Sequence, residues 1–96
     1  MTIPIRERDW QQTILDAARM LGWVCIHHYD SRRTAPGWPD VICCREGRML
    51  AIEVKTEKGR VTPHQAFWLD ALGTVPGITA MVIRPSDWDR LCEVLR

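Results

Sequence analysis

The chain has 96 residues and a mass of 11.1 kDa, so residues 1–96 form a single small domain and a two-domain enzyme is excluded. Apolar residues make up 46% and charged residues 26% of the sequence, a composition that excludes disordered, collagen-like and coiled-coil proteins. The net charge is +1, but positions 32–60 hold seven basic and four acidic side chains, which indicates either a local polyanion-binding surface or scattered solvated charge.

The first half of the chain predicts one helix followed by three strands. Apolar residues at helical spacing predict a helix over residues 7–21, and Gly22 supplies its stop. Residues 23–27 are rich enough in β-branched and aromatic side chains for a strand, whereas residues 29–38 are polar and read as a loop. Two further strands, 41–44 and 49–54, flank a tight turn that contains Gly47.

The second half predicts a helix, a strand and a last helix. Thr62 is a helix N-cap, Pro63 suits the first helical position, and Gln65 completes a capping box, so we expect a helix to about Leu72. Residues 78–83 predict a strand, and Ser86 is expected to cap a final helix. The resulting αβββαβα order predicts an α/β domain whose mixed sheet is flanked by helices.

Neither a membrane segment nor a zinc site is expected. The longest apolar runs are strand-sized, well below the roughly 20 residues of a membrane-spanning helix. The first ten residues lack the apolar core of a secretion signal, so we expect a cytoplasmic protein. The four cysteines lack C-x-x-C spacing, and the neighbours His27 and His28 would point to opposite faces of a strand.

The turn between the second and third strands fixes which residues face each other. If Glu46 and Gly47 are the two loop residues, Arg45 faces Arg48, and the same register places Asp40 opposite Glu53. Directly opposed residues hold their Cβ atoms about 4.5 to 5.5 Å apart, and like charges at that separation destabilise a sheet. A compensating cation is therefore expected between the two carboxylates.

Lys55 is the third group at this position. It shares the face of Glu53, because side chains alternate along a strand, while Leu50, Ile52 and Val54 point the other way into the core. A hard divalent cation such as Mg²⁺ takes oxygen ligands and accepts few of them from protein. The pattern thus predicts a magnesium site formed by Asp40 and Glu53.

Glu7 is an acidic residue on the apolar side of the first helix, together with Trp10 and Ile14. Two interpretations are open. An acid in the first turn is stabilised by the helix dipole and simply reaches water, or the carboxylate joins Asp40 and Glu53 at the metal. We prefer the second interpretation, because the other two carboxylates are predicted to be close to each other.

These residues resemble a known family. Pro39-Asp40 and Glu53-Val54-Lys55 resemble the motif of the PD-(D/E)XK nucleases, whose core also has the αβββαβ order. More narrowly, nearly the whole chain is similar to a stand-alone virus-type replication-repair nuclease (VRR-NUC) domain. The matching stretches are Leu21-Gly22-Trp23, Gly37-Trp38-Pro39-Asp40, Ile52-Glu53-Val54-Lys55 and Gln65-x-x-Trp68-Leu69-x-x-Leu72.

The resemblance implies a restriction-endonuclease-like core and a DNA phosphodiesterase that uses Mg²⁺ or Mn²⁺. It also implies structure-selective cleavage by a homodimer, with four-way (Holliday) junctions as one substrate, and leaves a viral or mobile-element origin open. By position, Asp40, Glu53, the Val54 carbonyl and Glu7 match the metal ligands. Lys55 matches the motif lysine, and Gln65 matches the glutamine of the second helix near the site.

Basic residues flank the predicted site in sequence. Arg32 and Arg33 precede Asp40, and Lys58 and Arg60 follow Lys55, in positions that suit contacts with DNA phosphates. Exposed Arg and Lys side chains are common on every protein surface, so ordinary solvation is the alternative for each of them.

Three hypotheses follow from the sequence. The first is a metal-dependent DNA endonuclease. The second is a nucleic-acid-binding module that keeps the nuclease fold without catalysis, although intact Asp40, Glu53 and Lys55 speak against it. The third is a structural α/β protein in which the facing carboxylates are accidental, and in that protein added metal would not raise the melting temperature.

Overall fold

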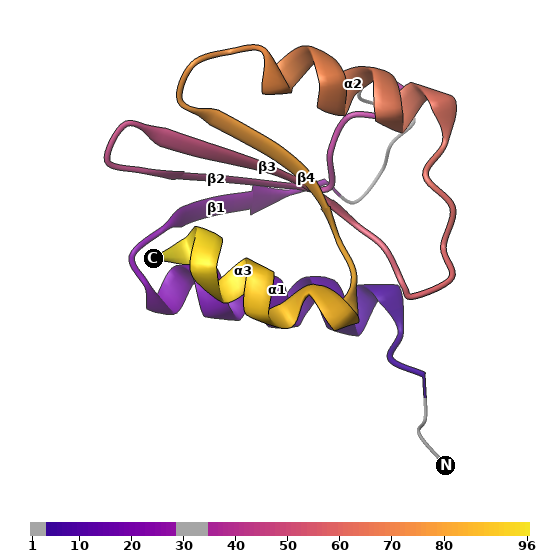
Figure 1. The fold of residues 1–96 in the computed structure, drawn as a ribbon. Helices are drawn as coiled ribbons and strands as arrows, with labels where there is room; N and C mark the ends of the chain where they lie inside the picture. The colour runs from indigo at the N-terminus through magenta and orange to yellow at the C-terminus, as the bar shows by residue number, and fades with distance from the viewer. Residues whose placement is uncertain (1–3, 29–34) are drawn as a thin grey trace.

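The computed structural model describes residues 4–28 and 35–96. In chain order its elements are α1 (Glu7–Met20), β1 (Val24–His27), β2 (Val41–Arg45), β3 (Arg48–Val54), α2 (Pro63–Gly73), β4 (Ile78–Ile83), the short 3-10 helix η2 (Pro85–Asp87) and α3 (Trp88–Leu95) (Figure 1). Apart from η2, this is the predicted αβββαβα order, and the α/β fold class is confirmed.

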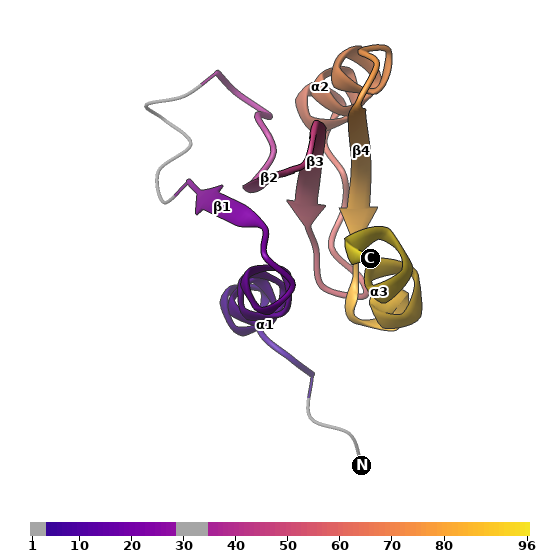
Figure 2. The ribbon, with the colours of Figure 1, turned by 90° about the vertical axis from the view of Figure 1, so that its left-hand side faces the viewer.

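The four strands form one mixed sheet in the order β1-β2-β3-β4. β1 and β2 are antiparallel, as are β2 and β3, whereas β3 and β4 are parallel. A parallel pair needs a crossover connection, and α2 lies within it. α1 and α3 lie on one side of the sheet and α2 on the other (Figure 2).

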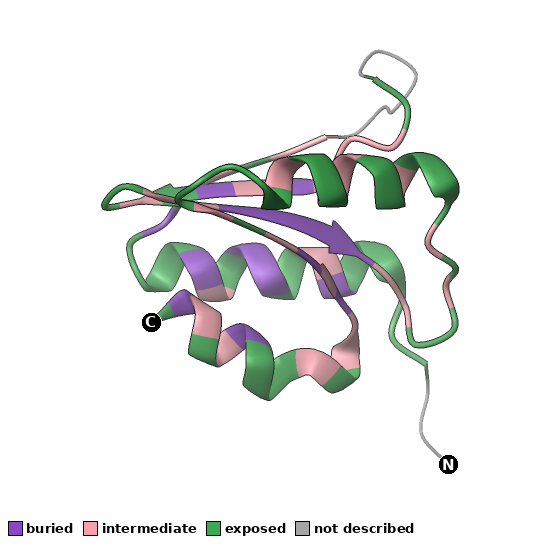
Figure 3. Cartoon of the chain, turned by 45° about the horizontal axis from the view of Figure 1, so that its top comes forward, coloured by how far each residue is buried: buried purple, intermediate pink, exposed green. Residues whose placement is uncertain are grey.

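The core lies between the sheet and the α1–α3 layer. Leu50, Ile52 and Val54 of β3 are fully buried there, together with Trp10 and Ile14 of α1. Each buried aliphatic side chain contributes about 1.5 to 3 kcal/mol, which anchors β3 firmly. α2 has no buried residue and exposes most of its surface (Figure 3).

The β2–β3 hairpin has the predicted register. Arg45 pairs with Arg48, Cys43 with Leu50 and Ile42 with Ala51. Glu46 and Gly47 have φ values of 48° and 77°, and two successive positive φ angles are typical of the two-residue turn that matches the twist of a hairpin. This turn sets the position of every residue further along both strands.

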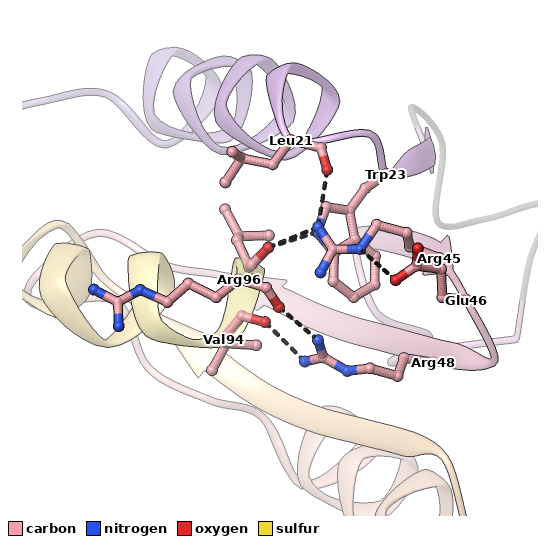
Figure 4. A network of polar contacts seen from close by, with 8 residues as sticks. Leu21, Trp23, Arg45, Glu46, Arg48, Val94 and Arg96 are labelled. Atoms are coloured by element: carbon pink, nitrogen blue, oxygen red, sulfur yellow. Dashed lines mark hydrogen bonds and ion pairs between the residues drawn. The ribbon is translucent and has the colours of Figure 1, made fainter.

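The two facing arginines beside the turn lie against the ring of Trp23. Their guanidinium carbons lie 4.5 and 5.0 Å from the ring centroid, for Arg45 and Arg48 respectively. Arg45 donates to the Leu21 and Leu95 carbonyls, and Arg48 donates to the carbonyls of Val94 and Arg96 (Figure 4). These contacts offset the like-charge repulsion and fix the hairpin turn against the ends of α1 and α3.

The capping box of α2 is confirmed, but the predicted cap of the last helix is wrong. Pro85, Ser86 and Asp87 form η2, and α3 begins only at Trp88, without a side-chain cap. The reason is a tertiary contact: the backbone N–H and the hydroxyl of Ser86 bind the carboxylate of Glu57, so Ser86 cannot cap the helix. Across residues 4–28 and 35–96, every helix is too short or too polar to cross a bilayer.

Candidate metal and nuclease site

Asp40 and Glu53 come together where β2 begins and β3 nears its end. The last ladder pair is Val41 with Ile52, so the same register places Asp40 beside Glu53. The Val54 N–H donates to Asp40 Oδ2 at 2.9 Å, which holds the Asp40 side chain across the end of the ladder. The sequence-predicted juxtaposition of the two acids is therefore present.

Glu53 is buried, with only 2% of its surface exposed. Burial, followed by the adjacent carboxylate of Asp40, raises the pKa of Glu53 to about 9. The Glu53 Oε1 atom accepts a hydrogen bond from Gln65 Nε2 at 3.0 Å, whereas its Oε2 atom is buried without a partner. A buried carboxylate oxygen without a donor is costly, and a cation at this oxygen would remove that cost.

Lys55 and Glu7 lie close enough to affect the charges of this pair. The positive charge of Lys55 opposes the rise in the pKa of Glu53. Glu7 is the first residue of α1 and is largely exposed, yet partial burial and then the charge of Asp40 raise its pKa, while Lys55 lowers it. Three carboxylates and one ammonium group thus share one end of the sheet.

Gln65 connects α2 to the acidic pair. Its Oε1 atom accepts the Thr62 N–H at 2.8 Å, and its Nε2 atom donates to Glu53. The Gln65 side chain therefore completes the capping box and also contacts the acidic pair. The sequence indicates both positions for it.

Gly37 places the preceding loop against the start of α2. It has φ +85°, and a Cβ atom there would collide with the His64 carbonyl and lie 2.7 Å from the Gln65 nitrogen. Gly37, Trp38, Asp40 and Gln65 line a shallow pocket at the site. Another pocket, beside the hairpin turn at the far end of β2 and β3, contains none of the predicted site residues.

The predicted phosphate-binding residues divide into two groups. Lys58 and Arg60 are exposed on the loop that follows Lys55. Arg32 and Arg33 lie outside the described residues, so their role stays a prediction.

Sequence reasoning missed two neighbours of the acidic pair. His28 lies beside Asp40, since its backbone N–H donates to the Asp40 carbonyl at 3.1 Å, and its Nε2 atom is buried without a partner. The register of the β1–β2 pair places His28 beside Asp40. The loop between these strands is long, so no turn type predicts that register from the sequence. Gly37 belongs to a stretch that matches the family, but nothing in the sequence indicates its close approach to α2.

The donor set suits a hard cation with few protein ligands. Within the described part of the chain, no three His, Cys, Asp or Glu side chains form a ready ligand cluster. Mg²⁺ commonly takes one or two carboxylates and completes its shell with water and phosphate oxygens, so the Asp40–Glu53 pair fits this ion. The buried Glu53 Oε2 atom, which accepts no hydrogen bond, is the oxygen best suited to bind such an ion.

Comparison with known families gives a match to the VRR-NUC domain over residues 6–87. The chain belongs to the VRR-NUC family. The matched range includes Asp40, Glu53, Lys55 and Gln65, and it confirms the resemblance drawn from the sequence motifs. Membership of this family implies a nuclease-type function, with DNA as the suggested substrate. A search of curated proteins gives no match.

Proposed function

We propose that this VRR-NUC domain is a divalent-metal-dependent endonuclease that hydrolyses phosphodiester bonds in DNA, with Mg²⁺ as its ion and Mn²⁺ as a substitute. The observation that carries the proposal is the pair of carboxylates from β2 and β3. Asp40 and Glu53 are held side by side, and the Glu53 Oε2 atom is buried without a donor. A fold that buries one carboxyl group beside another is best explained by a cation that uses both of them.

Asp40 and Glu53 would hold the ion, with the Val54 carbonyl and Glu7 as further ligands that remain predictions. When bound, such an ion polarises the scissile phosphate and lowers the pKa of a coordinated water. Gln65 holds one oxygen of Glu53 by a hydrogen bond, so the rotamer of Glu53 is fixed and its other oxygen stays available.

Lys55 would carry the remaining chemistry at the phosphate. It lies two residues after Glu53, just past the end of β3, and its ammonium group is close enough to lower the pKa values of both Glu53 and Glu7. We assign it to orienting the attacking water and to neutralising charge that develops on the phosphate. Lys58 and Arg60, together with Arg32 and Arg33, would contact phosphates on either side.

We further propose that the active form is a homodimer that cleaves branched DNA, four-way junctions included. A four-way junction offers two equivalent strands, and a two-fold dimer presents two sites to them. An exposed apolar surface supports this assembly: Val24 and Ile26 of the edge strand β1 are 73% and 57% exposed. Isolated apolar residues are common on surfaces, but a pair on one face of an edge strand favours pairing with another chain.

The cleavage test uses labelled four-way junctions, flaps, splayed arms and linear duplex with Mg²⁺, Mn²⁺ or chelator. We expect cleavage of branched DNA by the wild-type chain with either ion. Asp40→Asn and Glu53→Gln keep the shape of each side chain, and each should lower kcat by at least about 100-fold, because a metal ligand is lost. Glu46→Gln, on the exposed hairpin turn, is the control and should cleave normally.

Absence of cleavage on every substrate with both ions would refute the endonuclease proposal. DNA binding without cleavage would then favour a non-catalytic binding module. Cleavage of linear duplex alone would refute the junction proposal and leave the endonuclease standing.

A further inference from the structure

The loop between Lys55 and α2 is held by an arginine from outside it. Three carbonyl oxygens of this loop, from Thr56, Glu57 and Gly59, converge on one nitrogen of Arg84, at 2.6, 3.1 and 2.7 Å. Carbonyl dipoles that point at one place repel one another, and a cationic donor at their centre stabilises this conformation of residues 56–59. The Arg84 guanidinium is that cation.

A second contact joins the same two segments, and here the loop supplies the charged group, which is a carboxylate. The carboxylate of Glu57 accepts hydrogen bonds from the backbone N–H and the hydroxyl of Ser86 in η2. Arg84 and Ser86 follow β4 directly, and the Lys55 N–H donates to the Ile83 carbonyl at 3.2 Å. The ends of β3 and β4 and the loop thus form one connected unit.

This loop is bounded on both sides by residues of the acidic site. Lys55 precedes it, and Thr62 follows it as the N-cap of α2. Thr62 fixes the Gln65 side chain, which in turn donates to Glu53. Between these ends the loop presents Lys58 and Arg60 to solvent. The loop of residues 56–61 therefore connects two exposed cations to the support of Glu53.

We propose that Arg84 is a positioning residue for DNA cleavage: it fixes the loop of residues 56–61 so that Lys58 and Arg60 meet the DNA backbone in register with the metal site. The inference rests on the proposed nuclease function. In this scheme Arg84 acts through the loop that it holds, since one of its terminal nitrogens is bound by three loop carbonyls.

The test compares two variants. Arg84→Met keeps an unbranched chain in place of the aliphatic part of arginine but loses the charge and the hydrogen-bond donors, whereas Arg84→Lys keeps a cation. Arg90→Met on the exposed surface of α3 is the matched control. The first readout is limited trypsin digestion of the whole chain, well below the melting temperature. In Arg84→Met, cleavage after Lys58 and Arg60 should be about tenfold faster, because the loop opens locally, while cleavage after Arg19 in α1 is unchanged.

The second readout is DNA cleavage as a function of salt. For Arg84→Met we expect KM to rise about tenfold and the salt dependence of log KM to fall by about 1 for each lost phosphate contact. Arg84→Lys should restore part of both effects, and Arg90→Met should behave as the wild-type chain.

Unchanged trypsin rates at Lys58 and Arg60 in Arg84→Met would overturn the proposal, whatever the change in melting temperature. Faster trypsin cleavage with wild-type KM and salt dependence would overturn it as well, since the loop would then be held for stability alone. If the wild-type chain cleaves no DNA, the nuclease proposal fails separately. The trypsin rates would then still decide whether Arg84 holds the loop.

Discussion

Glu53 is the residue whose environment departs furthest from that of an ordinary surface acid. It is almost fully buried, it faces Asp40, and its pKa is raised to about 9. Without a cation the folded state therefore keeps a proton on Glu53 at neutral pH. A buried acid with a raised pKa lowers the stability of the free domain, so we interpret its position as one that serves cation binding.

Glu53→Gln tests this placement in the absence of metal. The unfolded chain loses the Glu53 proton near pH 4.5, whereas the folded chain keeps it to about pH 9, so the stability of the wild type falls as the pH rises through this window. The fall is at most about 1.4 kcal/mol for each pH unit. Gln65 can still donate to the amide oxygen of Gln at this position, and Glu53→Gln should lack the fall.

Urea unfolding at pH 6 and pH 8.5 with chelator measures the effect. The free energy of unfolding of Glu53→Gln, minus that of the wild type, should be larger at pH 8.5 than at pH 6. Glu46→Gln, on the exposed turn, should follow the wild type at both pH values. A constant difference between Glu53→Gln and the wild type at the two pH values would contradict a raised pKa for Glu53.

The sequence predicts the facing of Asp40 and Glu53 because a two-residue turn fixes a hairpin register by itself. It cannot predict the burial of Glu53 or the partnerless Oε2 atom, because these depend on how α2 and its Gln65 side chain pack over the strand ends. The same limit applies to Glu7, whose proximity to Asp40 comes from the packing of α1.

At the scale of elements, α2 has no fully buried residue, and its first turn lies in close contact with Gly37. A left-handed glycine at this point lets the loop backbone pass directly against the first turn of the helix. That contact holds the capped start of the helix, and with it the Gln65 side chain that reaches Glu53, against the loop.

Gly37→Ala should therefore damage both stability and the site. We expect a loss of about 3 kcal/mol, from the positive φ angle and from the clash with the backbone of His64 and Gln65. Gly47→Ala is a matched control, since Gly47 has φ +77° but no neighbour within 4 Å of an added Cβ, and it should cost only about 1 kcal/mol. Urea unfolding compares the two variants, and equal losses would show that the contact with α2 is not tight.

Most elements follow from local sequence signals. The helical spacing in α1, the capping box of α2 and the turn at Gly47 predict their elements within one or two residues. The start of α3 could not be predicted in this way. Ser86 has the chemistry of a helix cap, but the distant Glu57 carboxylate competes for it, and a sequence gives no measure of that competition.

At the scale of the whole molecule, β1 is the surface through which we expect two chains to pair. It is an edge strand, and Val24 and Ile26 are exposed on it. We expect Ile26→Lys to shift a homodimer to monomer in light scattering and to reduce junction cleavage more than cleavage of linear duplex. Met20→Lys, at an 86% exposed position of α1, is the control and should stay dimeric. A wild-type chain that is monomeric at high concentration would contradict the dimer.

The central claim is that Asp40 and Glu53 form a cation site, and a calorimetric titration with Mn²⁺ tests it most directly. Run at pH 7.5 in two buffers of different ionisation enthalpy, it counts the protons released with each ion. Since Glu53 is protonated in the free domain, we expect binding with release of about one proton, and tighter binding as the pH rises towards 9. Glu53→Gln and Asp40→Asn should bind weakly or not at all. Absence of Mn²⁺ binding by the wild-type chain, or equal binding by Glu53→Gln, would contradict the claim.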